Sequence, residues 1–260
     1  MQQETFGIVM VGAGRLATNL ALALHESGQR VVAVYSRTME SAQRLADKVG
    51  ALATNDIAAL PTYADAFILS VKDDALPTVI AQLRQGREDC CFFHTAGSVP
   101  MAVFGEHPLQ GVIYPMQTFS LDKRVDFSQI HIFIEGNTPQ TLQLARQLAQ
   151  TVSPHIHEMT SEQRRKLHLA AVFGCNFANH CYTLSAHILE REGLPFDVML
   201  PLIDETTAKV HTIHPRDAQT GPAVRFDESV MGAQKEMLND EPLLQQIYSL
   251  MSESIHLTKL

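Results

Sequence analysis

Cysteine is sparse in this chain and shows no metal-binding pattern. The four cysteines are Cys90, Cys91, Cys175 and Cys181. No two of them have the C-x-x-C spacing that structural zinc and redox sites use, so we expect reduced, buried thiols. The 12 histidines include two near pairs, His155/His157 and His211/His214, without a carboxylate or cysteine at ligand spacing. The sequence therefore predicts no metal site.

Long hydrophobic runs and an excess of basic charge are also missing. No apolar run approaches the roughly 18 residues that a membrane helix needs, which excludes a membrane-spanning segment. The net charge is -8, and the acidic and basic residues alternate, so no basic stripe is present for nucleic-acid phosphates. The stretch Met1 to Thr5 leads directly into an apolar strand and lacks the features of a signal peptide. We expect a cytoplasmic protein that binds neither a membrane nor nucleic acid.

The size and the hydrophobic content allow two domains. With 260 residues, 45% of them hydrophobic, the chain can bury a substantial core. The first half alternates short apolar runs with helical patterns, which is typical of βαβ units and a parallel sheet in an α/β fold. The predicted strands are Phe6–Val11, Val31–Ser36, Ala66–Val71, Cys91–Thr95, Gly111–Tyr114, His131–Glu135 and His155–Glu158. The predicted helices are Arg15–Ser27, Met39–Val49, Ala75–Gln85 and Thr138–Thr151, of which the first three end at a glycine.

From Thr160 onward the pattern is almost entirely helical, so we expect residues 1–159 and 160–260 to form separate domains. Thr160 and Gln163 fit a capping box, and a helix of about 32 residues extends from there to the Gly193-Leu194-Pro195 breaker. Its middle, Leu167 to Ile188, is apolar on nearly every face and should be buried on all sides. One small domain can hardly cover such a helix, so the sequence predicts a homodimer through the C-terminal domain. Further helices are expected at Phe196–Lys209, Glu228–Asn239 and Glu241–Leu257.

A glycine-rich turn follows the first strand. The run Gly12-Ala13-Gly14-Arg15-Leu16-Ala17 matches G-x-G-x-x-A between a strand and a helix. Gly12 permits a tight turn, Gly14 lets the backbone approach a diphosphate, and Ala17 lets the helix pack closely on the sheet. The helix N-terminus would then face the anion. Incidental glycines in an ordinary turn are the alternative, which the position of the motif disfavours.

The end of the second strand favours NADP(H) over NAD(H). An NAD-specific site carries a carboxylate here for the ribose hydroxyls, whereas this chain has Ser36, Arg37 and Thr38. Arg37 offers a charge-assisted fork to a 2′-phosphate, and the two hydroxyls can donate. Thr38 fits equally well as the N-cap of the next helix, and Arg37 could be a solvated surface residue.

Two further strand ends complete the predicted cofactor site. Ligands of open α/β sheets bind at the carboxyl ends of strands. Lys72 could contact phosphate or substrate, and one of Asp73 and Asp74 is better explained as a helix cap. The predicted cofactor residues are Gly12, Ala13, Gly14, Arg15, Leu16, Ser36, Arg37, Thr38, Ser70, Val71, Lys72, Thr95, Ala96 and Gly97.

Candidate catalytic residues lie in the helical half. His168, Asn176 and His180 recur along one face of the long helix, where unsatisfied polar groups would cost about 1–3 kcal/mol each. His168 and Asn176 fit catalysis and hydrogen-bonded core positions equally well, whereas His180 fits the core better. Lys166 is an alternative proton donor, although a solvated lysine is equally natural there.

The long loop between the last predicted helices adds a possible substrate contact. Arg225 could hold an anionic substrate group, and Asp227 is better explained as a helix N-cap. Tyr114, after another strand, is expected to form part of a cleft wall.

These motifs together resemble a known family over essentially the whole chain. They are the GAGRLA turn, Ser36-Arg37-Thr38, Ile68 to Asp74, Tyr114 to Phe119, His168 to Asn176 and Thr220 to Arg225. They resemble the bacterial NADP oxidoreductases that join a Rossmann domain to a C-terminal domain of unknown function. The first half is similar to pyrroline-5-carboxylate reductase and to deazaflavin-dependent NADP reductases. The second half looks like the helical, dimer-forming domain of the 6-phosphogluconate dehydrogenase superfamily, although that enzyme's Lys-x-x-His-Asn run is absent.

The resemblance implies a doubly wound Rossmann domain, a helical C-terminal domain, a dimer with the active cleft between domains, and hydride chemistry on a small metabolite. Our hypothesis is hydride transfer between NADP(H) and a C=O or C=N substrate. His168 or Lys166 would supply the proton, Asn176 would orient the substrate or the acid, and Arg225 would hold an anionic group. The alternatives are a non-catalytic NADP(H)-binding sensor or scaffold and a deazaflavin-dependent NADP reductase.

Overall fold

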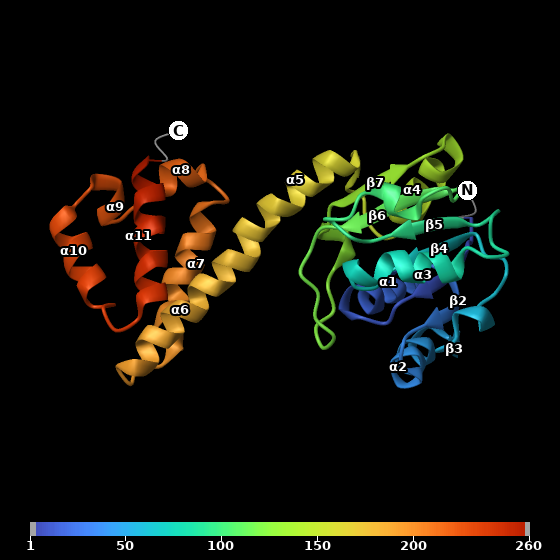
Figure 1. The fold of residues 1–260 in the computed structure, drawn as a ribbon, viewed down its shortest axis with the longest axis horizontal. Helices are drawn as coiled ribbons and strands as arrows, with labels where there is room; N and C mark the ends of the chain where they lie inside the picture. The colour runs from blue at the N-terminus through green and yellow to red at the C-terminus, as the bar shows by residue number, and fades with distance from the viewer. Residues whose placement is uncertain (1–3, 258–260) are drawn as a thin grey trace. The chain divides into compact units, whose positions relative to one another are not determined.

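The computed structural model describes residues 4–257. The chain divides into two compact units, Met1–Val172 and Phe173–Leu260 (Figure 1). This division falls inside the long helix, whereas the predicted domain boundary lies at its start. The boundary after residue 159 stays a prediction.

The first unit is built on an eight-stranded sheet in the order β3-β2-β1-β4-β5-β6-β7-β8. Every neighbouring pair is parallel except β6 and β7, which are antiparallel. The order reverses next to β1, as in doubly wound Rossmann sheets, which confirms the predicted fold class. The strands are β1 (Gly7–Val11), β2 (Arg30–Tyr35), β3 (Leu52–Thr54), β4 (Ala66–Leu69), β5 (Cys91–His94), β6 (Gln110–Pro115), β7 (Ile132–Gly136) and β8 (Ile156–Glu158).

Helices cover both faces of this sheet because its strands are apolar on both sides. Ile8 and Met10 of β1 pack with the helices α1, α2 and α4, and the alternate residues Val9 and Val11 pack with α3. The 3₁₀ turns η1 to η4 lie between the helices. The helices and turns are α1 (Arg15–Glu26), α2 (Met39–Val49), η1 (Ile57–Ala59), η2 (Asp73–Ala75), α3 (Leu76–Leu83), η3 (Met101–Phe104), η4 (Phe127–Gln129) and α4 (Pro139–Gln150).

The long helix predicted after Thr160 is present, with one irregularity. It consists of α5 (Ser161–Ala171), a π-helical turn η5 (Val172–Phe177) around Gly174, and α6 (Ala178–Arg191). The predicted capping box of Thr160 and Gln163 is confirmed. In the single chain, Arg164 is the one buried residue between Ser161 and Arg191, so the predicted burial on all sides, which involves a second subunit, stays a prediction.

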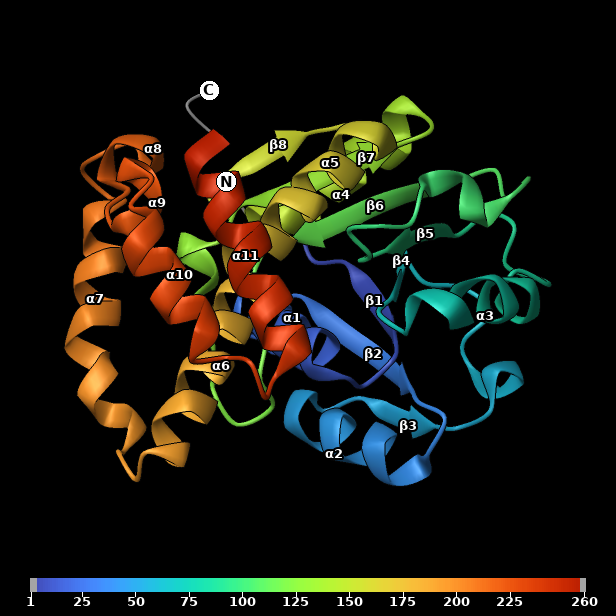
Figure 2. The same ribbon diagram turned by 60° about the vertical axis from the view of Figure 1, so that its left-hand side comes forward.

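The second unit, which Figure 2 shows from another side, contains α6 and the helices that follow it. They are η6 (Phe196–Met199), α7 (Leu200–Lys209), α8 (Pro215–Ala218), α9 (Pro222–Arg225), α10 (Glu228–Glu236) and α11 (Pro242–Leu257). The segment predicted as a long loop therefore holds two short helices. The N-cap predicted at Asp227 is confirmed, because its carboxylate accepts from Val230 N at 3.2 Å. No helix in the described part of the chain is long and apolar enough to span a membrane.

All four cysteines are free, but only part of the prediction about them is correct. Cys90 and Cys91 are buried, and burial raises the pKa of the Cys91 thiol to about 11. Cys181 is exposed and Cys175 is partly exposed, so the predicted burial is wrong for these two. Among residues 4–257, no group of three or more His, Cys, Asp or Glu side chains could hold a metal ion.

Candidate functional site

The turn between β1 and α1 has the geometry of a diphosphate cradle. Gly12 has a φ of 121°, and a Cβ there would lie 2.2 Å from the carbonyl oxygen of Ser70. Only glycine can bring the turn this close to the strand end after β4. A Cβ on Gly14, by contrast, would meet open space, which leaves room for a ligand. Ala17, on α1, is fully buried and packs in the same cluster as Ile8 and Met10 of β1, which agrees with the predicted close contact between helix and sheet.

The N-terminus of α1 is open toward an anion. Gly14 is its N-cap and offers no side-chain acceptor, and the first turn carries no acidic residue. The first backbone N–H groups of the helix therefore lack a capping side chain, and the positive end of the helix dipole is not neutralised locally. This is the arrangement in which helices bind phosphate groups.

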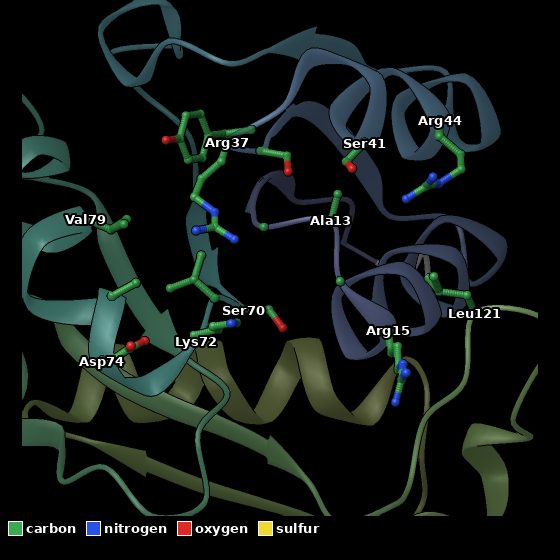
Figure 3. A pocket seen from close by; sticks show the side chains of 16 residues that line it. Ala13, Arg15, Arg37, Ser41, Arg44, Ser70, Lys72, Asp74, Val79 and Leu121 are labelled. Carbon is green, nitrogen blue, oxygen red and sulfur yellow. The ribbon is translucent and has the colours of Figure 1, made fainter.

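A cavity of about 520 Å³ lies above this turn (Figure 3). Arg37, Ser41 and Arg44 line the side formed by the end of β2 and the start of α2, and Ser70, Lys72 and Asp74 line the side that follows β4. The volume falls in the range of cofactor pockets. The remaining lining residues are Gly12, Ala13, Gly14, Arg15, Tyr35, Ser36, Val71, Ala75, Val79 and Leu121.

Four cations line this cavity, together with the carboxylate of Asp74. Arg15, Arg37, Arg44 and Lys72 form no ion pair with any residue between 4 and 257. Four unpaired cations along one cavity favour a ligand with several negative charges, such as a phosphorylated dinucleotide.

Most of the predicted cofactor residues line this cavity, and some do not. Thr38 is not among the lining residues, and its hydroxyl caps α2 by accepting from Ser41 N. The capping role predicted for Asp73 or Asp74 is wrong, since the helix start at Lys72 has no side-chain cap and Asp73 instead accepts from the Ser98 hydroxyl. Also outside the lining are Leu16, Thr95, Ala96 and Gly97.

Sequence reasoning missed Arg44 and Ser41 as cavity residues. They lie three positions apart and therefore share a face of α2. The signal was available, because that face begins directly after the strand end that carries Arg37.

A second cluster lies at the carboxyl ends of β5 and β6. The Tyr114 hydroxyl and His168 Nδ1 are 3.1 Å apart, and their rings meet edge to face with centroids 6.1 Å apart. Gly97, which follows β5, is so close that a Cβ would lie 2.5 Å from His168 Nδ1 and 2.9 Å from Tyr114 Cζ. The structure thus joins one predicted cofactor residue to one predicted catalytic residue within the first unit.

The position of His168 is fixed by an anchor one helical turn earlier. Arg164 is 1% exposed; it pairs with the Glu135 carboxylate on β7 and donates to the Val99 carbonyl at 2.6 Å. The Ser161 hydroxyl also donates to Glu135, at 2.7 Å. These bonds hold α5 against β7 and the segment after β5, and Leu167 adds apolar contact to a cluster that includes Tyr114.

The other predicted catalytic residues lie elsewhere. Lys166 is exposed and donates to Glu162 at 2.8 Å, on the solvent side of α5. Asn176, in the π-helical turn, and Arg225, at the end of α9, are exposed residues of the second unit. Their roles stay predictions.

Burial, with the Arg164 guanidinium, lowers the pKa of His94 to about 3, so this histidine is neutral.

The sheet order, the glycine turn and the cavity above it define a Rossmann-type dinucleotide-binding protein. A family model described as NADP oxidoreductase, coenzyme F420-dependent, matches residues 6–90, and a domain of unknown function, DUF2520, matches residues 130–255. No curated protein matches the chain.

Solved structures identify the family more closely. A crystal structure from Bacteroides fragilis, described as a "putative NADP oxidoreductase", is 51% identical, with 97% of this chain and 98% of that chain covered and a TM-score of 0.92. The chain belongs to the family of this NADP oxidoreductase.

More distant structures share the fold. An imine reductase from Myxococcus stipitatus in complex with NADP⁺ is 17% identical, with 96% and 92% of the chains covered and a TM-score of 0.68. A pyrroline carboxylate reductase from Plasmodium falciparum with NADP bound is 11% identical, with 96% and 98% covered and a TM-score of 0.60.

Proposed function

We propose that this protein is an NADP(H)-dependent oxidoreductase that transfers hydride to or from a small metabolite with a C=O or C=N group. The observation that carries the proposal is the cavity of the first unit. It has an uncapped helix N-terminus beside Gly14 at one end and the unpaired guanidinium groups of Arg37 and Arg44 at the other. The family relationship to an NADP oxidoreductase supports the same cofactor.

The residues present fit NADP(H) part by part. The diphosphate fits the open space at Gly14, where backbone N–H groups are free to donate. The 2′-phosphate of the adenosine ribose fits between Arg37, Ser41 and Arg44, because two guanidinium groups and a hydroxyl are suitable donors for a dianion. A carboxylate that would repel this phosphate is absent from the residues that line this side of the cavity.

The chemistry divides between cofactor and protein. When bound in this cavity, NADPH would supply the hydride for the carbon of a C=O or C=N bond, and the oxygen or nitrogen would need one proton. His168 is the better candidate for this proton than Lys166, because Lys166 is held by Glu162 at the surface. We assign to Asn176 the orientation of the substrate or of the acid, and to Arg225 the binding of an anionic substrate group.

The experiment that tests the proposal is isothermal titration calorimetry with NADPH and NADH, followed by a panel of ketones, aldehydes and imines with the tighter cofactor. We expect NADPH to bind at least about 10-fold more tightly than NADH, as an extra pair of charged hydrogen bonds implies. Absence of heat with both nucleotides would overturn the proposal. Binding without turnover across the panel would favour a non-catalytic NADP(H)-binding sensor or scaffold. Oxidation of NADPH by a deazaflavin, and by no other compound of the panel, would favour a deazaflavin-dependent NADP reductase.

We also propose a homodimer, formed through the second unit, in the cytoplasm. In the described part of that unit, residues 173–257, only Ala223 and Leu244 are buried. Large apolar side chains such as Phe173, Phe177 and Leu202 are half exposed or more. A unit with so small a core of its own needs a partner surface, and a second copy of this chain provides an equally apolar one.

A further inference from the structure

Three groups from separate parts of the first unit meet at one point: Gly97 after β5, Tyr114 on β6 and His168 on α5. Tyr114 is 7% exposed, and its ring is held between Phe133, with centroids 6.3 Å apart, and the His168 ring. The Tyr114 hydroxyl has one hydrogen-bond partner among residues 4–257, which is His168 Nδ1. The other ring nitrogen of His168, Nε2, makes no hydrogen bond within the same residues.

We infer that Tyr114 is a positioning residue, which engages Nδ1 of His168 and so confines proton exchange to Nε2. The inference rests on the proposed function, in which His168 supplies a proton. A histidine whose two nitrogens are both free can rotate and exchange its proton at either one. A fixed hydrogen bond at Nδ1 sets the ring orientation and determines which nitrogen faces the reacting group.

A hydroxyl suits this task better than a carbonyl or an ammonium group. It accepts from Nδ1–H when the ring is an imidazolium and can either accept or donate when the ring is neutral. The ring therefore keeps its partner while Nε2 loses a proton to the substrate oxygen or nitrogen and regains one from water. Arg164, one turn earlier on α5, holds the helix so that the two side chains stay opposed.

Gly97 makes the approach possible. A methyl group there would stand 2.5 Å from His168 Nδ1, 2.9 Å from His168 Cγ and 2.9 Å from Tyr114 Cζ. These distances are shorter than any van der Waals contact allows, and both rings would have to move. Glycine at this position therefore permits the Tyr114–His168 pair to sit directly beside the segment after β5, where the sequence places cofactor contacts.

The first test uses the cofactor-free full-length protein. Histidine is labelled with ¹⁵N, His168 is assigned with a His168→Gln variant, and exposed His25 is the internal reference. In the neutral imidazole ring the proton lies on either Nδ1 or Nε2, and the ¹⁵N spectrum gives the ratio of these two tautomers. In the wild-type protein we expect this ratio to differ between His168 and His25. In Tyr114→Phe, which removes only the hydroxyl, the ratio should move to the His25 value. An unchanged His168 spectrum in Tyr114→Phe would overturn the inference.

The second test separates positioning from binding. Once a substrate is found, Tyr114→Phe should lower kcat about 10- to 100-fold, as a misplaced proton donor implies, with KM and the NADPH Kd unchanged within about twofold. Gly97→Ala should give the same tautomer change with the Tyr114 hydroxyl intact. Tyr248→Phe, which removes a hydroxyl bonded to Gln234 in the second unit, and Gly232→Ala, whose Cβ meets open space, are the matched controls.

The two proposals fail in different ways. If the wild-type protein does not bind NADPH, the proposed function is refuted, whereas the tautomer result still stands. If the wild-type protein binds NADPH and Tyr114→Phe keeps the wild-type tautomer ratio or the wild-type kcat, the positioning role is refuted and the proposed function is not.

Discussion

At the scale of single residues, the proposed selectivity of the cavity depends on cations that form no ion pair among residues 4–257. Arg37 was found from the sequence because its position after the second strand has a defined role in dinucleotide sites. Arg44 was missed, although the predicted helix Met39–Val49 places Ser41 and Arg44 on one face that begins beside that strand end. Thr38 shows the opposite case, in which two roles fitted the sequence and only the hydrogen bond to Ser41 decided for the cap.

Replacing Arg44 by Gln should weaken NADPH binding about 10- to 100-fold and leave NADH binding unchanged. The reason is that a charged hydrogen bond to the 2′-phosphate contributes about 1.5–3 kcal/mol and NADH has no such phosphate. Calorimetry with both nucleotides measures the two affinities. Lys48→Gln, in the last turn of the same helix, is the control and should change neither. Equal losses for both nucleotides would place Arg44 elsewhere than at the 2′-phosphate.

His94 should make the protein sensitive to acid. Burial, with the Arg164 guanidinium, lowers its pKa from the ordinary 6.5 to about 3. Between these two pH values, His94 is protonated in the unfolded chain and neutral in the folded chain. The stability that depends on neutral His94 is complete above pH 6.5 and is lost as the pH falls toward 3. Between pH 6.5 and 4.5 this amounts to about 2–3 kcal/mol.

Urea denaturation of His94→Phe at both pH values measures this effect. The variant should be about 1 kcal/mol less stable at pH 6.5, because His94 Nδ1 no longer accepts from Ala96 N–H, and should lose less stability on acidification. His25→Gln, at an exposed histidine, should keep the wild-type pH dependence. If His94→Phe kept it too, another group would be the acid-sensitive one.

At the scale of elements, patterns predicted the helices and strands well wherever one face or both faces are buried. The short strand β3 was missed because Leu52 is 72% exposed, so no burial pattern marks it. The antiparallel direction of β7 has no local sequence signal, since the direction depends on how the segment between β6 and β7 returns. The Tyr114–His168 pair joins β6 to α5, and no spacing rule relates two such elements.

Replacing Arg164 by Leu should cost about 3–5 kcal/mol of folding stability. The change removes the buried guanidinium and leaves the Glu135 carboxylate and the Val99 carbonyl with fewer partners. Chemical denaturation of Arg164→Leu, Glu135→Leu and the double variant gives the coupling energy. We expect the double variant to be clearly less destabilised than the sum of the two single variants. Arg165→Leu, at the exposed neighbour, should change stability by no more than about 0.5 kcal/mol.

At the scale of the whole molecule, the two units differ in how they bury apolar surface. The first unit encloses cores on both faces of its sheet and contains the complete cavity. The second unit leaves most of its large apolar side chains exposed in the single chain. The sequence indicated this need for a partner through a helix that is apolar all round, but it could not show how little of that helix one chain would bury.

Charging the exposed helix face should therefore separate the proposed dimer into single chains. Phe173 and Phe177 are 64% and 50% exposed, and their rings meet edge to face with centroids 4.9 Å apart. A Phe173→Glu/Phe177→Glu variant should raise the dimer Kd at least about 100-fold, because two aromatic anchors of an interface are lost and carboxylates replace them.

Light scattering coupled to size exclusion gives the mass across a dilution series. Leu52→Glu, at an equally exposed apolar residue of the first unit, should leave the wild-type dimer intact. A wild-type protein that runs as a single chain at every concentration would contradict the proposal. The charged variant should still bind NADPH with wild-type affinity, because every residue that lines the cavity belongs to the first unit.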